Sequence, residues 1–143
     1  DSDYAIAFRD DGATIFCGKH VPEEKREITI EKEIVSTFYD ESYFGIITEN
    51  EQEENEHKYK MELYRENGSK CFQAYFDMEY TNIKICGEEI FLYNGTELMI
   101  YTTSGKLKYH AAYEKQISEV IPSDGLGKYV IITPDSVDII KIG

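Results

Sequence analysis

Short apolar segments with the pattern of β-strands recur along the chain at intervals of about forty residues. Four of them can be aligned, and they are Tyr4–Phe8, Tyr43–Thr48, Glu89–Tyr93 and Tyr129–Thr133. Their first residues lie 39, 46 and 40 positions apart. A repeat of this length that contains only strands is typical of the blades of a β-propeller.

Turn-forming dipeptides divide each repeat into four predicted strands. In the third copy, Asn94-Gly95 and Ser104-Gly105 have the composition of hairpin loops that join adjacent antiparallel strands. The strands predicted for the three complete copies are 4–8, 13–17, 27–30 and 34–38, then 44–48, 61–64, 71–76 and 82–86, then 89–93, 98–101, 107–112 and 117–121. The fourth copy supplies only two strands, within 128–142.

The predicted fold class is all-β and β-propeller-like, with about three and a half four-stranded antiparallel blades in one partial propeller domain. The predicted blades are 4–40, 43–87 and 89–124, followed by a half-blade at 128–143. The first strand of each copy, such as Tyr129–Ile132, is almost wholly apolar, which predicts that it is covered on both faces and lies innermost. The second strand alternates, as in Met61–Tyr64, and the fourth is more polar, so both are predicted to lie toward the rim.

The charge of the chain restricts its partners. It has 15 basic and 28 acidic residues, a formal net charge of -13, and its basic residues form no stripe. Nucleic acids and anionic lipid surfaces would be approached against repulsion, so we expect neither as a partner. The longest apolar runs are shorter than the roughly 18 residues of a membrane span. The sequence starts at Asp1, so we expect any targeting segment to lie upstream.

Few residues suggest chemistry. The glutamate-rich segment 49–57 has no glycine and no alternating Asp or Asn, so it predicts a solvated loop and no calcium site. The histidines and cysteines have no metal-binding spacing, and the thiols are predicted to stay free; these residues are His20, His57, His110, Cys17, Cys71 and Cys86. We therefore predict no catalytic, cofactor or metal residues, and Asn67 and Asn94 are interpreted as turn residues although each starts a glycosylation sequon.

Tyrosine is abundant, with twelve copies in the chain. The tyrosines that could line a groove for a sugar or a peptide are Tyr39, Tyr80, Tyr101, Tyr109 and Tyr113. Packing within strands is the alternative role for them. An enzyme would be favoured by acidic residues or histidines where several of the first strands begin, but those positions hold Tyr4, Tyr43, Glu89 and Tyr129.

Several segments carry a resemblance to a known group of proteins. They include Ile34–Thr48, Lys60–Tyr64, Glu79–Lys84, Glu89–Asn94 and Ile132–Lys141. Together they resemble the C-terminal half of a bacterial family of unknown function from anaerobic Gram-positive bacteria. The resemblance implies a β-propeller that follows a single N-terminal membrane anchor outside this chain. It implies an extracytoplasmic location, although free cysteines alone would favour a reducing compartment.

Two functions from different classes follow. A rigid array without evident catalytic groups favours a non-enzymatic binding or scaffold segment, whose ligand would be a protein or a cell-envelope component. The alternative is a propeller-type hydrolase or lyase that acts on a cell-envelope or sugar ligand. The half-blade predicts an open strand edge at Val137, Ile139 and Ile142, so we also expect self-association, most simply as a two-fold dimer in which two half-blades complete one another.

Overall fold

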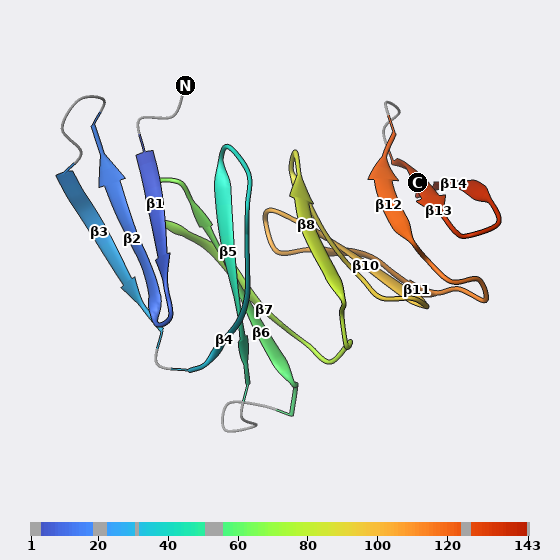
Figure 1. Ribbon diagram of the computed structural model, residues 1–143, viewed down its shortest axis with the longest axis horizontal. Helices are drawn as coiled ribbons and strands as arrows, with labels where there is room; N and C mark the ends of the chain where they lie inside the picture. The colour runs from blue at the N-terminus through green and yellow to red at the C-terminus, as the bar shows by residue number, and fades with distance from the viewer. Residues whose placement is uncertain (1–3, 19–22, 31, 51–55, 124–126, 143) are drawn as a thin grey trace. The chain divides into compact units, whose positions relative to one another are not determined.

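The computed structural model describes residues 4–18, 23–30, 32–50, 56–123 and 127–142, with the backbone alone described at 23–25. Within these ranges the chain forms fourteen β-strands and no helix (Figure 1). The strands are β1 (Tyr4–Arg9), β2 (Gly12–Cys17), β3 (Glu23–Thr29), β4 (Ile34–Tyr39), β5 (Tyr43–Glu49), β6 (Tyr59–Arg65), β7 (Lys70–Phe76), β8 (Asn82–Cys86), β9 (Glu89–Tyr93), β10 (Glu97–Thr102), β11 (Leu107–Ala112), β12 (Glu119–Pro122), β13 (Lys128–Ile132) and β14 (Val137–Lys141). The prediction of an all-β fold is confirmed.

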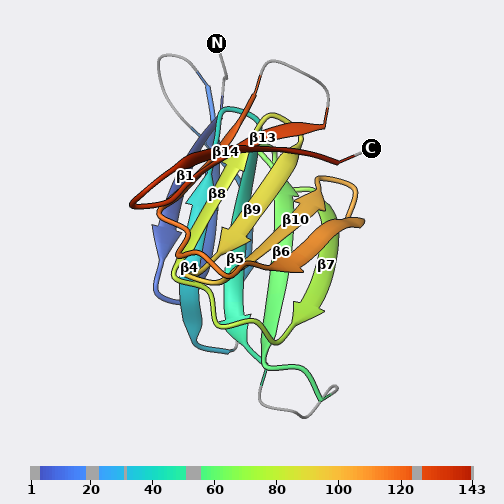
Figure 2. The same cartoon turned by 90° about the vertical axis from the view of Figure 1, so that its right-hand side faces the viewer.

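The strands form four antiparallel sheets in which sequence neighbours pair. Their orders are β1-β2-β3, β4-β5-β6-β7, β8-β9-β10-β11 and β12-β13-β14. The chain divides into two compact units, 1–77 with the first two sheets and 78–143 with the last two. Figure 2 shows β5, β6 and β7 side by side within their sheet.

The sheets begin one strand earlier than the sequence predicted. The strand at 34–38 was assigned to the blade before it, but β4 pairs with β5, with Tyr39 opposite Phe44. The cause is a tight turn in which one carboxylate oxygen of Asp40 accepts hydrogen bonds from the amides of Ser42 and Tyr43, both at 2.8 Å. Gly87, with φ +63°, closes the corresponding turn between β8 and β9. These turns are hairpins within a sheet, whereas the predicted blade boundaries place them between blades.

The predicted order of strands within a sheet was also wrong. The first strands of the second and third copies, β5 and β9, are buried on both faces as expected, but each lies between two neighbours and not at an edge. The second strands β6 and β10 are almost as fully buried, although they were predicted to lie toward the rim. Each four-stranded sheet has two interior strands, β5 and β6 or β9 and β10. Both backbone edges of an interior strand are paired, which explains why both strands are buried.

The core of the first unit joins the facing sides of its two sheets. It contains Ala13, Ile15, Phe44, Ile46 and Tyr64, which are buried or nearly so. The rings of Phe44 and Tyr64 stack with their centroids 5.1 Å apart. In the second unit the corresponding core is built around Phe91, Leu98, Ile100, Val120 and Tyr129. Burial of side chains of this size stabilises a fold by roughly 1.5–3 kcal/mol each.

Candidate functional site: a cleft beside an open strand edge

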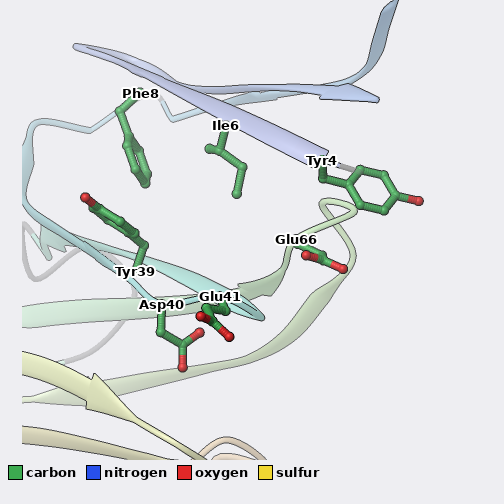
Figure 3. Close-up of a pocket in the computed structure, with 7 residues that line it drawn as sticks. All are labelled: Tyr4, Ile6, Phe8, Tyr39, Asp40, Glu41 and Glu66. Carbon is green, nitrogen blue, oxygen red and sulfur yellow. The ribbon is translucent and has the colours of Figure 1, made fainter. Parts of the chain in front are cut away.

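A concave surface of the first unit lies along β1. We call it the edge cleft, and seven residues line it: Tyr4, Ile6, Phe8, Tyr39, Asp40, Glu41 and Glu66 (Figure 3). Its volume is about 430 Å³, which is within the range of clefts that hold small ligands or side chains.

One wall of the edge cleft comes from a single strand. Tyr4, Ile6 and Phe8 are spaced two residues apart on β1 and therefore lie on one face of it. All three are half-buried, whereas Ala5 and Ala7 on the opposite face are exposed. The strand therefore presents its large apolar side chains to the cleft, and Ala5, Ala7 and Arg9 to the other side.

The other wall comes from two turns. Tyr39 ends β4, Asp40 and Glu41 form the turn before β5, and Glu66 lies in the turn after β6. The two turns are tied together because the amide of Glu66 donates a hydrogen bond of 3.0 Å to the carbonyl of Ser42. The turn at Asp40 is itself fixed by the carboxylate described above. Backbone geometry thus positions the carboxylates of this wall.

The cleft has an aromatic end and an acidic end. At the aromatic end the rings of Phe8 and Tyr39 face each other with centroids 6.2 Å apart, and Phe8 also meets Phe44 edge-on at 5.8 Å. Tyr39 remains 73% exposed, which is unusual for a large aromatic side chain. At the other end, Figure 3 shows Glu66 below Tyr4. On the same wall, Asp40 lies below Tyr39 and Glu41 lies between Asp40 and Glu66. A ligand with an apolar part and a cationic part would complement this arrangement.

The edge of β1 adds backbone groups to the site. Within the described residues β1 pairs with β2 on one side, and no strand pairs with its other edge. In the second sheet of the same unit, the corresponding position beside β5 is filled by β4. An unpaired edge of this kind is a template for an additional strand. The edge cleft can therefore accept an extended polypeptide through backbone hydrogen bonds and side-chain contacts together.

Two of the positions singled out for an enzyme meet in the second unit. The Tyr129 hydroxyl donates a hydrogen bond of 2.6 Å to Glu89, and the Lys108 ammonium lies 3.0 Å from both the Glu89 carboxylate and the Tyr129 hydroxyl. The hydrogen bonds to Tyr129 and Glu89 raise the pKa of Lys108, and burial followed by the hydrogen bond to Glu89 raises the pKa of Tyr129. Both groups hold their protons more tightly than usual, so this triad is poorly suited to general-base chemistry near neutral pH.

Sequence analysis missed a buried carboxylate in the first unit. Glu62 on β6 is 8% exposed, accepts a hydrogen bond from Tyr64, and lies 3.3 Å from Lys60 and 3.7 Å from Lys70. Burial and then the hydrogen bond to Glu62 raise the pKa of Tyr64. Glu62, Lys60 and Tyr64 also line a polar pocket of about 230 Å³. Their spacing of two along one strand is the signal that could have revealed the cluster.

The predicted tyrosine groove does not form as one surface. Tyr39 lies in the edge cleft of the first unit, and Tyr101 is buried in the second. Tyr109 and Tyr113 do meet, with their hydroxyl oxygens 2.5 Å apart. Tyr113 lines a separate pocket of about 320 Å³ in the second unit. Tyr80, which is half-buried, lines none of these three clefts.

The other candidate residues have local partners. His57 lies 2.8 Å from Asp77, and His110 lies 3.0 Å from Glu97. His20 and most of the glutamate-rich segment lie outside the described residues. Across the described part of the chain, no three Asp, Glu, His or Cys side chains are grouped as metal ligands.

The cysteines form no disulfide within the described residues, and the asparagines of the two sequons bond within their own turns. All three cysteines are free thiols, and burial raises the pKa of Cys71. The side-chain carbonyls of Asn67 and Asn94 accept backbone hydrogen bonds within their turns, at 2.8 to 2.9 Å.

The described residues contain no helix long and apolar enough to cross a membrane.

Solved structures with this fold are β-propellers. BamB from Moraxella catarrhalis matches 99% of this chain with a TM-score of 0.55 and 13% identity, and BBS1N, solved in complex with ARL6DN, matches 98% with a TM-score of 0.53 and 15% identity. The chain spans 45% of the first protein and 50% of the second. The computationally designed protein Ika4 matches 100% of the chain with a TM-score of 0.60 and 10% identity, and 88% of Ika4 is covered.

These likenesses are too low in identity to carry more than the fold, which is that of a partial β-propeller. A search of the curated proteins finds no significant match. A family profile matches residues 1–142, which is almost the entire sequence. The chain therefore belongs to the family of unknown function DUF5711.

Proposed function

We propose that this chain is a non-enzymatic binding segment of an extracytoplasmic propeller, and that it binds an extended polypeptide at the edge cleft. The observation that carries the proposal is the combination of an open β1 edge with an aromatic end and an acidic end in one cleft. Strand addition to a sheet edge obtains affinity from backbone hydrogen bonds and specificity from pockets for alternate side chains. The carboxylates favour a ligand strand with a basic residue at one end.

Short synthetic peptides test this function directly. A peptide with alternating valine and isoleucine and one terminal lysine should bind the full chain in a calorimetric titration, and the same peptide with glutamate in place of lysine should bind more weakly. Tyr39→Ala should reduce binding because the exposed ring forms the aromatic end of the cleft. Leu107→Ala removes another exposed large apolar side chain, 44% exposed, in the second unit and should leave binding unchanged. Equal binding of the basic and acidic peptides, or of neither, would contradict the proposal.

The extracytoplasmic location and the membrane anchor form part of the same proposal. They are supported by the resemblance to anchored bacterial propellers. Protease treatment of intact cells that produce the complete protein should cleave this segment, and cleavage only after lysis would contradict the location.

A propeller-type hydrolase or lyase acting on a cell-envelope or sugar ligand is the alternative function. The triad of Glu89, Lys108 and Tyr129 is the observation in its favour, because it brings three ionisable side chains within 3.0 Å of one another. Turnover of an envelope polysaccharide that disappears in Glu89→Gln, with the fold retained, would establish it. The raised pKa values of Lys108 and Tyr129 argue against it.

Self-association through an open sheet edge completes the proposal. The proposal is supported by the edge strands of the two three-stranded sheets, which are β1 and β3 in one sheet and β12 and β14 in the other within the described residues. The designed Ika4 chain, of similar length, supports the view that an array of this size can exist as a separate polypeptide. Light scattering at micromolar concentration should give a mass near twice the 16.6 kDa of one chain. A monomer would contradict self-association.

A further inference from the structure

The strand β14 carries a surface pattern that matches the edge cleft. Within the described residues it pairs with β13 alone, so its other edge is open. On one face of the strand, Val137 is 67% exposed, Ile139 is 70% exposed, and Lys141 is also exposed. The face therefore presents two apolar side chains followed by a basic one.

The opposite face of β14 is occupied within its own unit. Ile140 packs against the core of the second unit, and the Asp138 carboxylate lies 3.8 Å from Lys115. Only the face with Val137, Ile139 and Lys141 is therefore available to a partner. Its two exposed apolar residues are far more accessible than is usual for valine and isoleucine.

Positive charge is concentrated at one end of this strand. Lys141 lies directly opposite Lys128 on β13, and both side chains are exposed. Like charges placed directly across a strand pair are destabilising. Carboxylates from a partner would remove this repulsion, and three of them line the edge cleft, at Asp40, Glu41 and Glu66, of which Glu66 lies below Tyr4 (Figure 3).

We propose that β14 of a second copy of this chain is the strand that binds the edge cleft, antiparallel to β1. This inference rests on the proposed function, since it names the polypeptide that the cleft binds. The register places Lys141 opposite Tyr4, Ile139 opposite Ile6 and Val137 opposite Phe8. In an antiparallel pair, residues directly opposite each other lie on the same face, so all three partner side chains enter the cleft.

The order of residues fits this direction. Lys141 reaches the acidic end, where Glu66 lies below Tyr4, and Val137 reaches the aromatic end beside Phe8 and Tyr39 (Figure 3). On the other face of the joined sheet, Ile140 and Asp138 of the second copy lie opposite Ala5 and Ala7, whose small side chains leave room for them. A register shifted by one residue would place the Asp138 carboxylate opposite Ile6 or Phe8 and turn Lys141 to the other face, away from the carboxylates, so charge favours the proposed register.

Charge-reversal variants of the full chain test the pairing. Lys141→Glu should weaken self-association by about tenfold, which corresponds to roughly 1.4 kcal/mol, and Glu66→Lys should weaken it similarly. The double variant should recover most of the association because the two charges are exchanged. Glu49→Lys changes the net charge by the same amount at the far end of β5, where the side chain is exposed, and serves as the control. Circular dichroism confirms that each variant retains its strands.

The outcomes separate the pairing from the proposed function. Recovery in the double variant, together with competition by a synthetic peptide of residues 134–142, supports the inference. Association that is unaffected by Lys141→Glu would overturn the β14 pairing while leaving self-association intact. Binding of basic peptides by a chain that stays monomeric would overturn the pairing and leave the edge cleft as a site for other polypeptides. If the chain neither associates nor binds peptides, the proposed function fails as well.

Discussion

A single buried carboxylate, that of Glu62, contributes to the stability of the first unit. Glu62 lies in a buried strand and is stabilised by Lys60, Lys70 and the hydroxyl of Tyr64. Its side chain is only 11% exposed, whereas that of Lys70 is 40% exposed. A buried charge that loses its partners carries the full cost of its desolvation, but an exposed one is solvated by water.

The Glu62 cluster should therefore respond unequally to truncation. Glu62→Ala should lower the free energy of unfolding by about 2 kcal/mol, because it removes the carboxylate that accepts the hydrogen bond of the buried Tyr64 hydroxyl. Lys70→Ala should cost less than about 1 kcal/mol, since its ion pair is long and partly exposed. Urea unfolding of the two variants measures both values, and equal losses would contradict the assignment.

Tyr93 connects stability to pH in the second unit. Its hydroxyl donates a hydrogen bond of 3.0 Å to Glu119, which is also paired with Lys84 at 2.8 Å, and burial followed by Glu119 raises the pKa of Tyr93 to about 12. The unfolded chain releases this proton near the ordinary value of 10.0. The stabilisation is therefore complete below pH 10 and is lost as the pH rises toward 12.

Tyr93→Phe isolates this effect because it keeps the ring and removes the proton. The fall in unfolding free energy between pH 10 and 12 should be shallower in the variant than in the parent chain. Other buried tyrosines contribute to the same window, so the difference between the two curves is the informative quantity. Parallel curves would show that Tyr93 titrates normally in the folded protein.

The sequence shows only the spacing of Glu62 from Lys60 and Tyr64, because the environment that buries Glu62 is assembled by tertiary structure. The alternation Met61-Glu62-Leu63 predicted a side chain that faces water. Lys70 comes from the next strand, and the sheet β1-β2-β3 covers the face that Glu62 shares with Tyr64. The edge cleft was missed for the same reason, since β1 and two separate turns have to come together to form it. Only Tyr4 and Tyr39 had been singled out beforehand.

At the scale of elements, short turns determine which strands share a sheet. The strand count was predictable because each hairpin has its own local signal, as at Ser104-Gly105. The grouping was not, because the turns at Asp40 and Gly87 join strands as tightly as those within a predicted blade. Register within a sheet then depends on close packing between neighbours, and β4 against β5 is the clearest case.

Gly45 on β5 tests that packing. It lies directly opposite Phe38 on β4, and a methyl group added at Gly45 would approach within 2.0 Å of the Phe38 ring. Gly45→Ala should therefore lower the free energy of unfolding by about 1–3 kcal/mol through overpacking. Phe38→Leu in the same chain should recover part of the loss, since the shorter side chain vacates that space. Thermal unfolding that is unchanged in Gly45→Ala would contradict this close approach.

At the scale of the whole molecule, net charge opposes the proposed association. Two copies that each carry -13 repel each other over distances well beyond the contact residues. Salt reduces this long-range term, because the Debye length falls from about 30 Å at 0.01 M to about 8 Å at 0.15 M. Ion pairs in direct contact are less affected. The balance between these terms determines how association depends on ionic strength.

We expect self-association to strengthen as the salt concentration rises over this range. Sedimentation at several ionic strengths measures the association constant, and the double variant with exchanged charges should show the same trend. A steady decrease with salt would mean that contact ion pairs outweigh the general repulsion between copies.

The exposure of Tyr39 also makes its position suitable for a fluorescent probe of the cleft. The chain contains no tryptophan, so any tryptophan placed in it would be the sole indole chromophore. At position 39 the side chain is 73% exposed and faces Phe8, so a Tyr39→Trp variant would emit from the mouth of the cleft. Arrival of a polypeptide strand would shield the indole from water and shift its emission to shorter wavelength. The speed and concentration dependence of that shift would then report how quickly the site fills and empties.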